Sequence, residues 1–163
     1  MTPLRIAALA LMTGASAGPS LALSCMRPDV ATSYQLAQKE AADYVIVEGH
    51  LSHDITGVPR NRPKGAPPVT FPARIEGRAL TSGGFTAPFS GPVTVTLTCQ
   101  SIWCAPAPPQ EAEVIVFLRK ASGGAFVLEA QPCRRNIFVD PPAGSAARIL
   151  ACHQGRDCPR PRP

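Results

Sequence analysis

The stretch EVIVFLRKASGGAFVLEA, residues 113–130, carries the clearest fold signal in the chain. Two apolar runs, rich in the β-branched and aromatic residues that favour strands, flank a short link that contains two glycines. Glycine supplies the backbone freedom that a tight turn between strands needs. The pattern therefore predicts a β-hairpin, and further strand patterns precede it.

Three more strands are predicted before this hairpin. DYVIVEGHLS at 43–52 is an apolar run typical of a central strand, whereas TFPARIEGRAL at 70–80 and VTVTLTC at 93–99 alternate between apolar and polar residues. Gly77 predicts a bulge or a sharp bend in the second of these strands. SGGFTAPFSGP at 82–92 is rich in turn residues and is predicted to be a connector.

Helix patterns flank the strands. Asp29 is a suitable N-cap for apolar residues that repeat at helical spacing, which predicts a helix at about 29–42. A last helix is predicted to start near Ser145. Five short strands favour a small closed barrel, most often an OB-fold, over a β-sandwich, which usually has about seven strands or more. We therefore expect a mainly β fold: a five-stranded OB-like β-barrel with an N-terminal and a C-terminal helix, stabilised by disulfides.

Residues 1–24 have the pattern of a signal peptide. One positive charge, a short apolar core and a small-residue exit follow one another, and the core is too short to span a bilayer. Small residues favour a cut after Ala22 or Ser24. We expect a single domain at 25–158 and a flexible Pro/Arg tail at 159–163. No later stretch is apolar enough to cross a membrane, so we expect an exported protein, either periplasmic or secreted.

Charge and motifs narrow the classes of function. The chain has 16 basic and 11 acidic residues, and the scatter of the basic ones is more typical of a solvated surface than of a binding stripe. Few aromatic residues are available to stack on bases, so we expect no nucleic-acid partner. No G-x-S-x-G, H-E-x-x-H or Walker sequence is present, and the chain is predicted not to be an enzyme.

Six cysteines follow the signal peptide and favour an oxidising compartment with up to three disulfides. They are Cys25, Cys99, Cys104, Cys133, Cys152 and Cys158. Their spacing does not match a two-residue zinc knuckle. Sequence alone does not choose among the possible pairings, but Cys152 with Cys158 is the simplest. We expect Cys25 to pair with Cys99 or Cys104, and Cys133 to take the remaining partner.

His50 and His53 are weak candidates for a metal site. On a strand, residues three apart point to opposite faces, so the two imidazoles could share an ion only if the strand had ended. A solvated strand end is the simpler interpretation, and we expect no metal and no cofactor. The loop at 54–68 is dense in proline and glycine, which leaves open whether it is functional or merely mobile.

The order of elements resembles a known module. A cysteine near the mature N-terminus is followed by a helix, the strand ADYVIVEGHL, a mid-chain cysteine pair, the strand EVIVFLRK and closing cysteines around a last helix. This order is similar to the netrin-type module of tissue inhibitors of metalloproteinases, an OB-like barrel with disulfide-tied ends. It also resembles small exported proteins of Gram-negative bacteria that share the LSC start and the W-C element. The resemblance covers nearly the whole mature chain.

The resemblance implies a mode of action. In that inhibitor family, the amine and carbonyl of an N-terminal cysteine bind the catalytic zinc of the protease, and the next side chain enters the specificity pocket. Carried over, Cys25 would bind the zinc and Met26 would fill the pocket. The family begins Cys-x-Cys, whereas Arg27 stands at the place of the second cysteine. A cut after Ala22 would leave two residues ahead of Cys25 and block zinc binding.

Three functions remain open at this point. The first is an exported, non-enzymatic binding or structural domain with an unknown protein partner. The alternative is a metalloprotease inhibitor that acts through a free N-terminal Cys25. The third, an enzyme or metal carrier, depends on whether His50 and His53 bind metal.

Overall fold

The computed structural model describes residues 29–59, 62–133 and 135–158. Strands take up 46% of these residues and helices 17%, which confirms the predicted mainly β class. The predicted signal peptide at 1–24 and tail at 159–163 lie outside the described residues, so both stay predictions.

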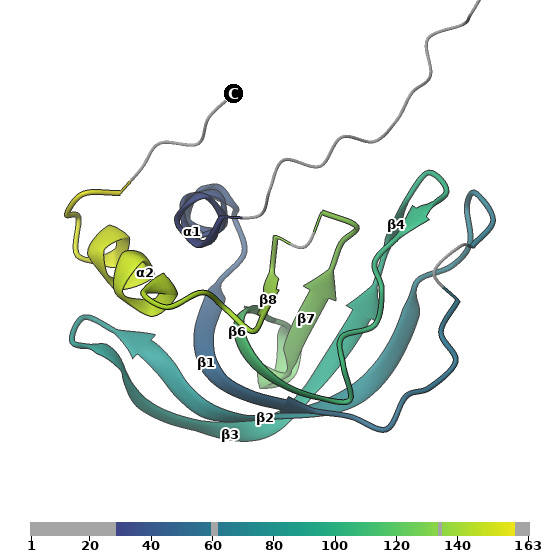
Figure 1. The fold of residues 1–163 in the computed structure, drawn as a ribbon, viewed down its shortest axis with the longest axis horizontal. Helices are drawn as coiled ribbons and strands as arrows, with labels where there is room; N and C mark the ends of the chain where they lie inside the picture. Colours follow the sequence, from purple (N-terminus) through teal and green to yellow (C-terminus); the bar gives the residue numbers. More distant parts are fainter. Residues whose placement is uncertain (1–28, 60–61, 134, 159–163) are drawn as a thin grey trace, which may run out of the picture.

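Two helices and eight strands make up the described part of the chain (Figure 1). The strands are β1 (Tyr44–Ser52), β2 (Val69–Thr81), β3 (Gly84–Leu97), β4 (Cys99–Gln100), β5 (Trp103–Cys104), β6 (Glu111–Lys120), β7 (Phe126–Ala130) and β8 (Ile137–Val139). The helices are α1 (Val30–Lys39) and α2 (Ser145–His153), with a 3₁₀ turn, η1 (Ser122–Gly124), between β6 and β7. The expected number of five strands is wrong because β4, β5 and β8 are only two or three residues long, too short to leave a pattern in the sequence.

Hydrogen-bonded pairing runs from β1 through β2, β3, β7 and β6 and returns to β1. Each pair in this ring is antiparallel except β3 and β7, which run parallel over Thr94–Leu97. β8 pairs with the middle of β6, and β4 pairs with β5 as a separate small hairpin. The long strands β2 and β3 curve across the lower part of the view in Figure 1, and the turn between them lies beside α2.

The segment 82–92 is not the predicted connector, because most of it belongs to β3. β2 turns directly into β3, and Gly84 takes a φ of 113°, a conformation that favours glycine. Pro88 and Pro92 lie four residues apart on β3, so their backbone nitrogens point to the same edge of the strand. That edge is the one away from β2, since a proline nitrogen that faced β2 would break the ladder of hydrogen bonds.

Gly77 marks a close approach of two strands and not the predicted bulge. It lies opposite Gly49 in the β1–β2 pair, where a Cβ on Gly77 would lie 2.1 Å from the carbonyl oxygen of Glu48. The register shift falls later, between Ala79 and Leu80. Glycine is required at 77 because β1 and β2 pass too close to leave room for a side chain.

Two apolar cores hold the elements together. The inner core lies within the ring of strands and contains Val47 and Ile75, both fully buried. The outer core lies between the helices and the outer face of β1 and β6, where Ile115 and Phe117 are fully buried against α1 and α2. Both faces of β6 are therefore covered, which explains why its sequence is a continuous apolar run and does not alternate.

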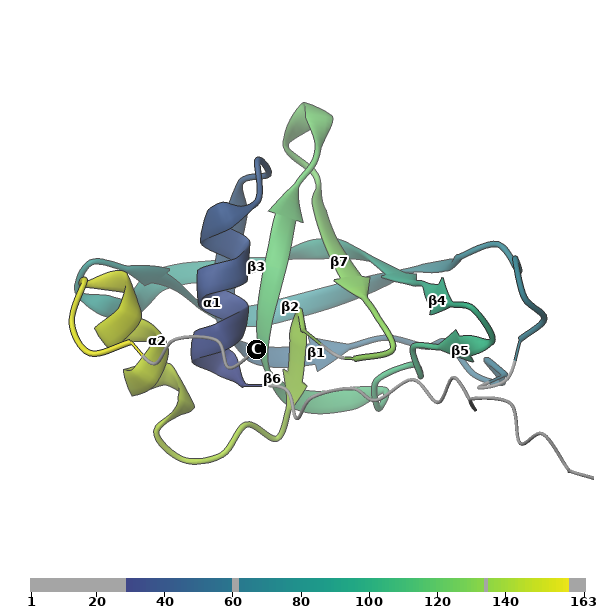
Figure 2. The same ribbon diagram turned by 90° about the horizontal axis from the view of Figure 1, so that it is seen from above.

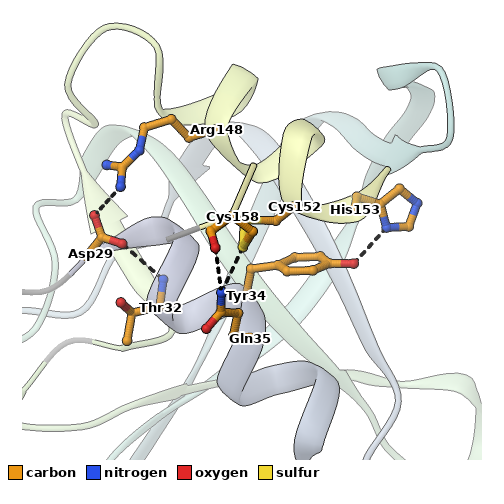
Figure 3. Close-up of a disulfide and its surroundings, with 8 residues drawn as sticks. All are labelled: Asp29, Thr32, Tyr34, Gln35, Arg148, Cys152, His153 and Cys158. Atoms are coloured by element: carbon orange, nitrogen blue, oxygen red, sulfur yellow. Dashed lines mark hydrogen bonds and ion pairs between the residues drawn. A yellow bond between two sulfur atoms is a disulfide. The ribbon is translucent and has the colours of Figure 1, made fainter. Parts of the chain in front are cut away.

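Asp29 caps α1 as predicted. Its carboxylate accepts a hydrogen bond from the Thr32 amide at 3.0 Å and lies 2.8 Å from the Arg148 guanidinium of α2 (Figure 3). Partial burial raises the pKa of Asp29, but the Thr32 amide and Arg148 outweigh it and hold the pKa below its ordinary value of 3.8. The helix ends at Lys39, slightly earlier than predicted, because Glu40 is already extended.

The end of α2 is fastened to α1 (Figure 3). The predicted Cys152–Cys158 disulfide is present. The Gln35 side-chain amide of α1 donates to the Cys158 carbonyl oxygen at 3.4 Å, and its nitrogen lies 2.9 Å from the Cys158 sulfur. The Tyr34 hydroxyl lies 2.9 Å from Nδ1 of His153. The bridge therefore sits inside a set of contacts that joins the two helices.

Candidate functional site

His50 lies on the exposed outer face of β1. Its Nε2 is 2.5 Å from Oε2 of Glu111, and its Nδ1 is 3.0 Å from Oε1 of Glu113, both on the neighbouring strand β6. Hydrogen bonds to Glu111 and Glu113 raise the pKa of His50 above its ordinary value of 6.5. The imidazole therefore bridges two carboxylates across the surface of the sheet.

His53 follows the end of β1 and has separate partners. Its buried ring makes an edge contact with Phe71, with ring centroids 5.0 Å apart, and its Nε2 lies 3.2 Å from the Pro108 carbonyl oxygen. The structure thus does not bring the two histidines together. Among the described residues, no group of three His, Cys, Asp or Glu side chains is arranged to hold a metal ion.

An open groove of about 500 Å³ lies where β1 ends, and we call it the charged groove. The side chains of Asp54, Arg74 and Glu111 line it beside His53. All three charged residues are exposed, whereas His53 is buried, so the predicted solvated strand end is confirmed at His50 and wrong at His53. The first residues of the 54–68 loop therefore border a surface groove that carries charged side chains.

The 54–68 loop is anchored through Arg62, which is only 9% exposed. Its guanidinium donates to the carbonyl oxygens of Pro67 at 2.9 Å and Leu97 at 3.1 Å. Leu97 is the last residue of β3, so Arg62 holds the loop beside the start of the β4–β5 hairpin (Figure 1). The composition of the loop could not indicate this buried contact.

A second groove, about 540 Å³ in volume, lies between β3 and the turn that joins β6 to β7. Residues 88–94 of β3, Pro72 of β2 and residues 124–126 line it. None of these described lining residues is charged, and we call this the uncharged groove; the Arg74 guanidinium donates to the hydroxyl of Ser90 in its lining at 3.0 Å. The rings of Phe89 and Phe126 meet here edge to face, with centroids 5.1 Å apart. The lining suits an apolar or aromatic group.

Sequence reasoning missed this groove, although the sequence contains a signal for it. Residues 79–110 include no Asp, Glu, Lys, Arg or His. The chain as a whole carries 16 basic and 11 acidic residues, so this gap sets β3 and the following hairpin apart as uncharged surface.

One edge of β3 is open beside the uncharged groove. β7 pairs with this edge only over Thr94–Leu97, and no other described strand pairs with it over 84–93. Pro88 and Pro92 direct their nitrogens to this edge and offer no hydrogen-bond donor there. Prolines on an edge strand oppose the addition of another strand. The groove therefore favours a ligand that inserts a side chain.

The β4–β5 hairpin presents two large apolar side chains to solvent. Ile102 is 55% exposed and Trp103 48%, and within the described ranges they are the exposed large hydrophobic residues. The Cys99–Cys104 disulfide closes the hairpin at its base, and Ser101 turns the chain with a φ of 59°. We call the two side chains the Ile–Trp tip.

The predicted pairing of Cys25 with Cys99 or Cys104 is wrong, because Cys99 and Cys104 pair with each other. They lie directly opposite in the register of β4 and β5, where the chain makes a tight turn that sequence spacing did not reveal. Cys133 is also disulfide-bonded. Cys25 and Met26 lie outside the described residues, so the role that the resemblance implies for them stays a prediction.

Comparison with protein-family models, with curated proteins and with solved structures finds no match for this chain. In the part of the chain that the structure covers, no helix is long and apolar enough to cross a membrane.

Proposed function

We propose that this protein is an exported, non-enzymatic binding domain that takes an apolar or aromatic side chain of a polypeptide partner into the uncharged groove. The observation that carries the proposal is the lining of this groove, where Phe89 and Phe126 present aromatic surface beside the open edge of β3. Ligand sites are typically concave and mostly apolar, and a domain has few of them.

An OB-like barrel fits this function. The ring of strand pairings, closed between β1 and β6 and parallel only between β3 and β7, supports an OB-like barrel. Barrels of that kind bind ligands on the face of their second and third strands, between neighbouring loops. β2 and β3 take those places in the ring, and the β6–β7 turn flanks the groove as such a loop would.

The uncharged lining indicates the class of ligand. A nucleic acid needs a cationic groove along its backbone, whereas the described lining contains no Lys or Arg and one guanidinium, that of Arg74, is hydrogen-bonded to its residue Ser90. Pro88 and Pro92 oppose recognition by strand addition. An inserted apolar or aromatic side chain meets both constraints, because it needs neither a charge nor an edge donor.

The disulfides support export. Cys99–Cys104 and Cys152–Cys158 are bridged and Cys133 is bonded, a degree of cross-linking typical of an oxidising compartment. The binding domain is therefore proposed to meet its partner outside the cytoplasm.

A nuclear magnetic resonance titration with end-blocked peptides tests the binding function. We expect Ala-Ala-Phe-Ala to shift the backbone amides of the non-proline residues in 88–94 and of residues 124–126, and the matched Ala-Ala-Glu-Ala to leave them unchanged. Equal shifts with both peptides, or shifts confined to other surfaces, would contradict the proposal.

Two glutamate substitutions on one turn serve as a matched pair. Ala125→Glu puts a charge into the lining at an exposed position and should weaken peptide binding by at least roughly tenfold, because the bound apolar group would desolvate that charge. Ser122→Glu adds the same charge at an exposed position of the same turn outside the lining and should bind like the wild type.

A further inference from the structure

We propose that the partner of the uncharged groove is a second copy of this chain, whose Ile–Trp tip enters the groove. This inference rests on the binding function proposed above and names the partner. Each copy would supply a tip to one neighbour and a groove to another.

The tip has the properties of an inserted anchor. Ile102 and Trp103 are adjacent and about half exposed, and neither belongs to the inner or the outer core. The fold therefore does not account for their presence. Removal of their apolar surface from water would drive association, and tryptophan is among the residues most enriched at the energetic centres of interfaces.

The tip is held in place before it binds. The Cys99–Cys104 bridge closes the hairpin, and the Ala105 amide donates to the Thr98 carbonyl oxygen at 2.9 Å across its base. The Thr98 amide in turn donates to the Ala130 carbonyl oxygen at the end of β7, at 3.0 Å. A tip fixed in this way loses little conformational entropy on binding.

The two surfaces match in chemistry. The tip lies within the uncharged stretch 79–110, and the described lining of the groove carries no charge either. At about 540 Å³, the groove is in the size range of sites that enclose small ligands, so it has room for an indole and a neighbouring side chain. A buried indole N–H needs an acceptor, and the hydroxyl group of Thr94 in the lining can supply one, whereas the Ser90 hydroxyl already accepts from Arg74 at 3.0 Å.

The tip cannot reach the groove of its own chain. Phe89 in the groove and Leu97 at the base of the tip lie on one continuous strand, which holds them on the order of 25 Å apart. Figure 2 shows the β4–β5 hairpin at one end of the molecule and the β6–β7 turn projecting from its side. Because two different surfaces would meet, the assembly is head to tail, and it extends as a chain or closes as a ring.

Two variants test the tip and the groove separately. Trp103→Ala removes the indole of the tip and keeps the groove, whereas Ala125→Glu blocks the groove and keeps the tip. Both positions are exposed, so both proteins should fold. In sedimentation velocity, the wild type should assemble as concentration rises, and each variant alone should associate at least about 30-fold more weakly. An equimolar mixture should form a one-to-one dimer and nothing larger, since one productive contact remains.

Trp103 is the one tryptophan in the sequence, so its fluorescence reports the contact directly. In the mixture, all tryptophan emission comes from the Ala125→Glu protein. The emission should shift to shorter wavelength and become protected from acrylamide when Trp103→Ala protein is added. The Trp103→Ala/Ala125→Glu double variant, which has no open groove, should leave the emission unchanged. Ser122→Glu should assemble like the wild type.

Wild-type protein that stays monomeric at millimolar concentration, or Trp103→Ala protein that assembles like the wild type, would overturn the inference. A shift of Trp103 emission on phospholipid vesicles, without any shift on added protein, would also overturn it and make the tip a membrane anchor. The peptide Ala-Ala-Phe-Ala separates the two proposals. If the protein is monomeric and the peptide binds the groove, only the second copy fails as partner; if the peptide does not bind either, both proposals fail.

Discussion

The two short disulfide loops differ in what surrounds them, although they are almost equal in size. Cys99–Cys104 and Cys152–Cys158 span sequence separations of 5 and 6, and they lie at opposite ends of the molecule, beside β5 and α2 (Figure 2). Loop closure alone assigns about 2 kcal/mol to each. One bridge is packed among contacts between helices, whereas the other holds two apolar side chains in solvent. The same covalent link thus secures the fold in one place and presents a surface in the other.

A third disulfide should stabilise the fold more than either of the two short disulfide loops. Cys133 is disulfide-bonded, and Cys25 is the cysteine of the sequence that remains, so we predict a Cys25–Cys133 bridge in a non-reducing peptide map. Such a bridge closes about 100 residues, and its loss in Cys133→Ser should lower the free energy of unfolding by about 4 kcal/mol. A peptide map that places Cys25 elsewhere, or a chain that lacks Cys25 after processing, would refute the pairing.

Two isoleucines, one in α2 and one in the tip, test whether the two regions differ in their contribution to stability. Ile149 of α2 is fully buried, whereas Ile102 of the tip is 55% exposed. Ile149→Ala should lower the free energy of unfolding by about 3 kcal/mol, because it leaves a cavity in the outer core. Ile102→Ala should change it by less than about 0.5 kcal/mol. Urea unfolding measures both, and a loss of similar size at Ile102 would show that the tip is part of the core.

Removing each bridge in turn tests the comparison directly. Cys152→Ser/Cys158→Ser should lower the free energy of unfolding by about 2–3 kcal/mol, because loop closure and contacts with α1 are both lost. Cys99→Ser/Cys104→Ser should cost about 2 kcal/mol at most, yet it should weaken self-association at least about tenfold, since the tip is no longer held. If both folded variants associate equally well, the distinction between the loops fails.

Asp29→Ala tests the start of α1, with a smaller expected effect than the loss of the Cys152–Cys158 bridge. Loss of the cap and of the Arg148 pair should cost about 1 kcal/mol at pH 7. Burial opposes the shift, but the Thr32 amide and Arg148 hold the pKa of Asp29 below 3.8. A lowered pKa means that the contribution is present above the unfolded-state pKa and is lost as pH falls through the folded-state pKa. The difference in stability between wild type and variant should therefore be larger at pH 7 than at pH 2; a constant difference would contradict this origin.

The elements with strong local signals could be predicted from the sequence. The continuous apolar run of β6 and the glycine link after it indicated a strand and a hairpin without any knowledge of the neighbours. The cap at Asp29 and the repeat that follows indicated α1 in the same way. The Cys152–Cys158 bridge was predictable because it closes a short loop at the end of a helix.

The remaining features depend on partners that are distant in sequence. Pro88 and Pro92 resemble turn residues until the pairing shows that they face an open edge. Gly77 is required by the approach of Gly49, not by its own neighbours. The uncharged groove forms only where β3 meets the β6–β7 turn. The uncharged stretch 79–110 was the one sign of it in the sequence.

The most direct test asks, by nuclear magnetic resonance, whether the tip of one copy binds the groove of another. Isotope-labelled Trp103→Ala protein, which keeps the groove, is titrated with unlabelled Ala125→Glu protein, which keeps the tip. We expect shifts of the amides of the non-proline residues in 88–94 and of residues 124–126, and no shifts when the double variant is added. Shifts confined to any other surface, or none at millimolar concentration, would contradict it.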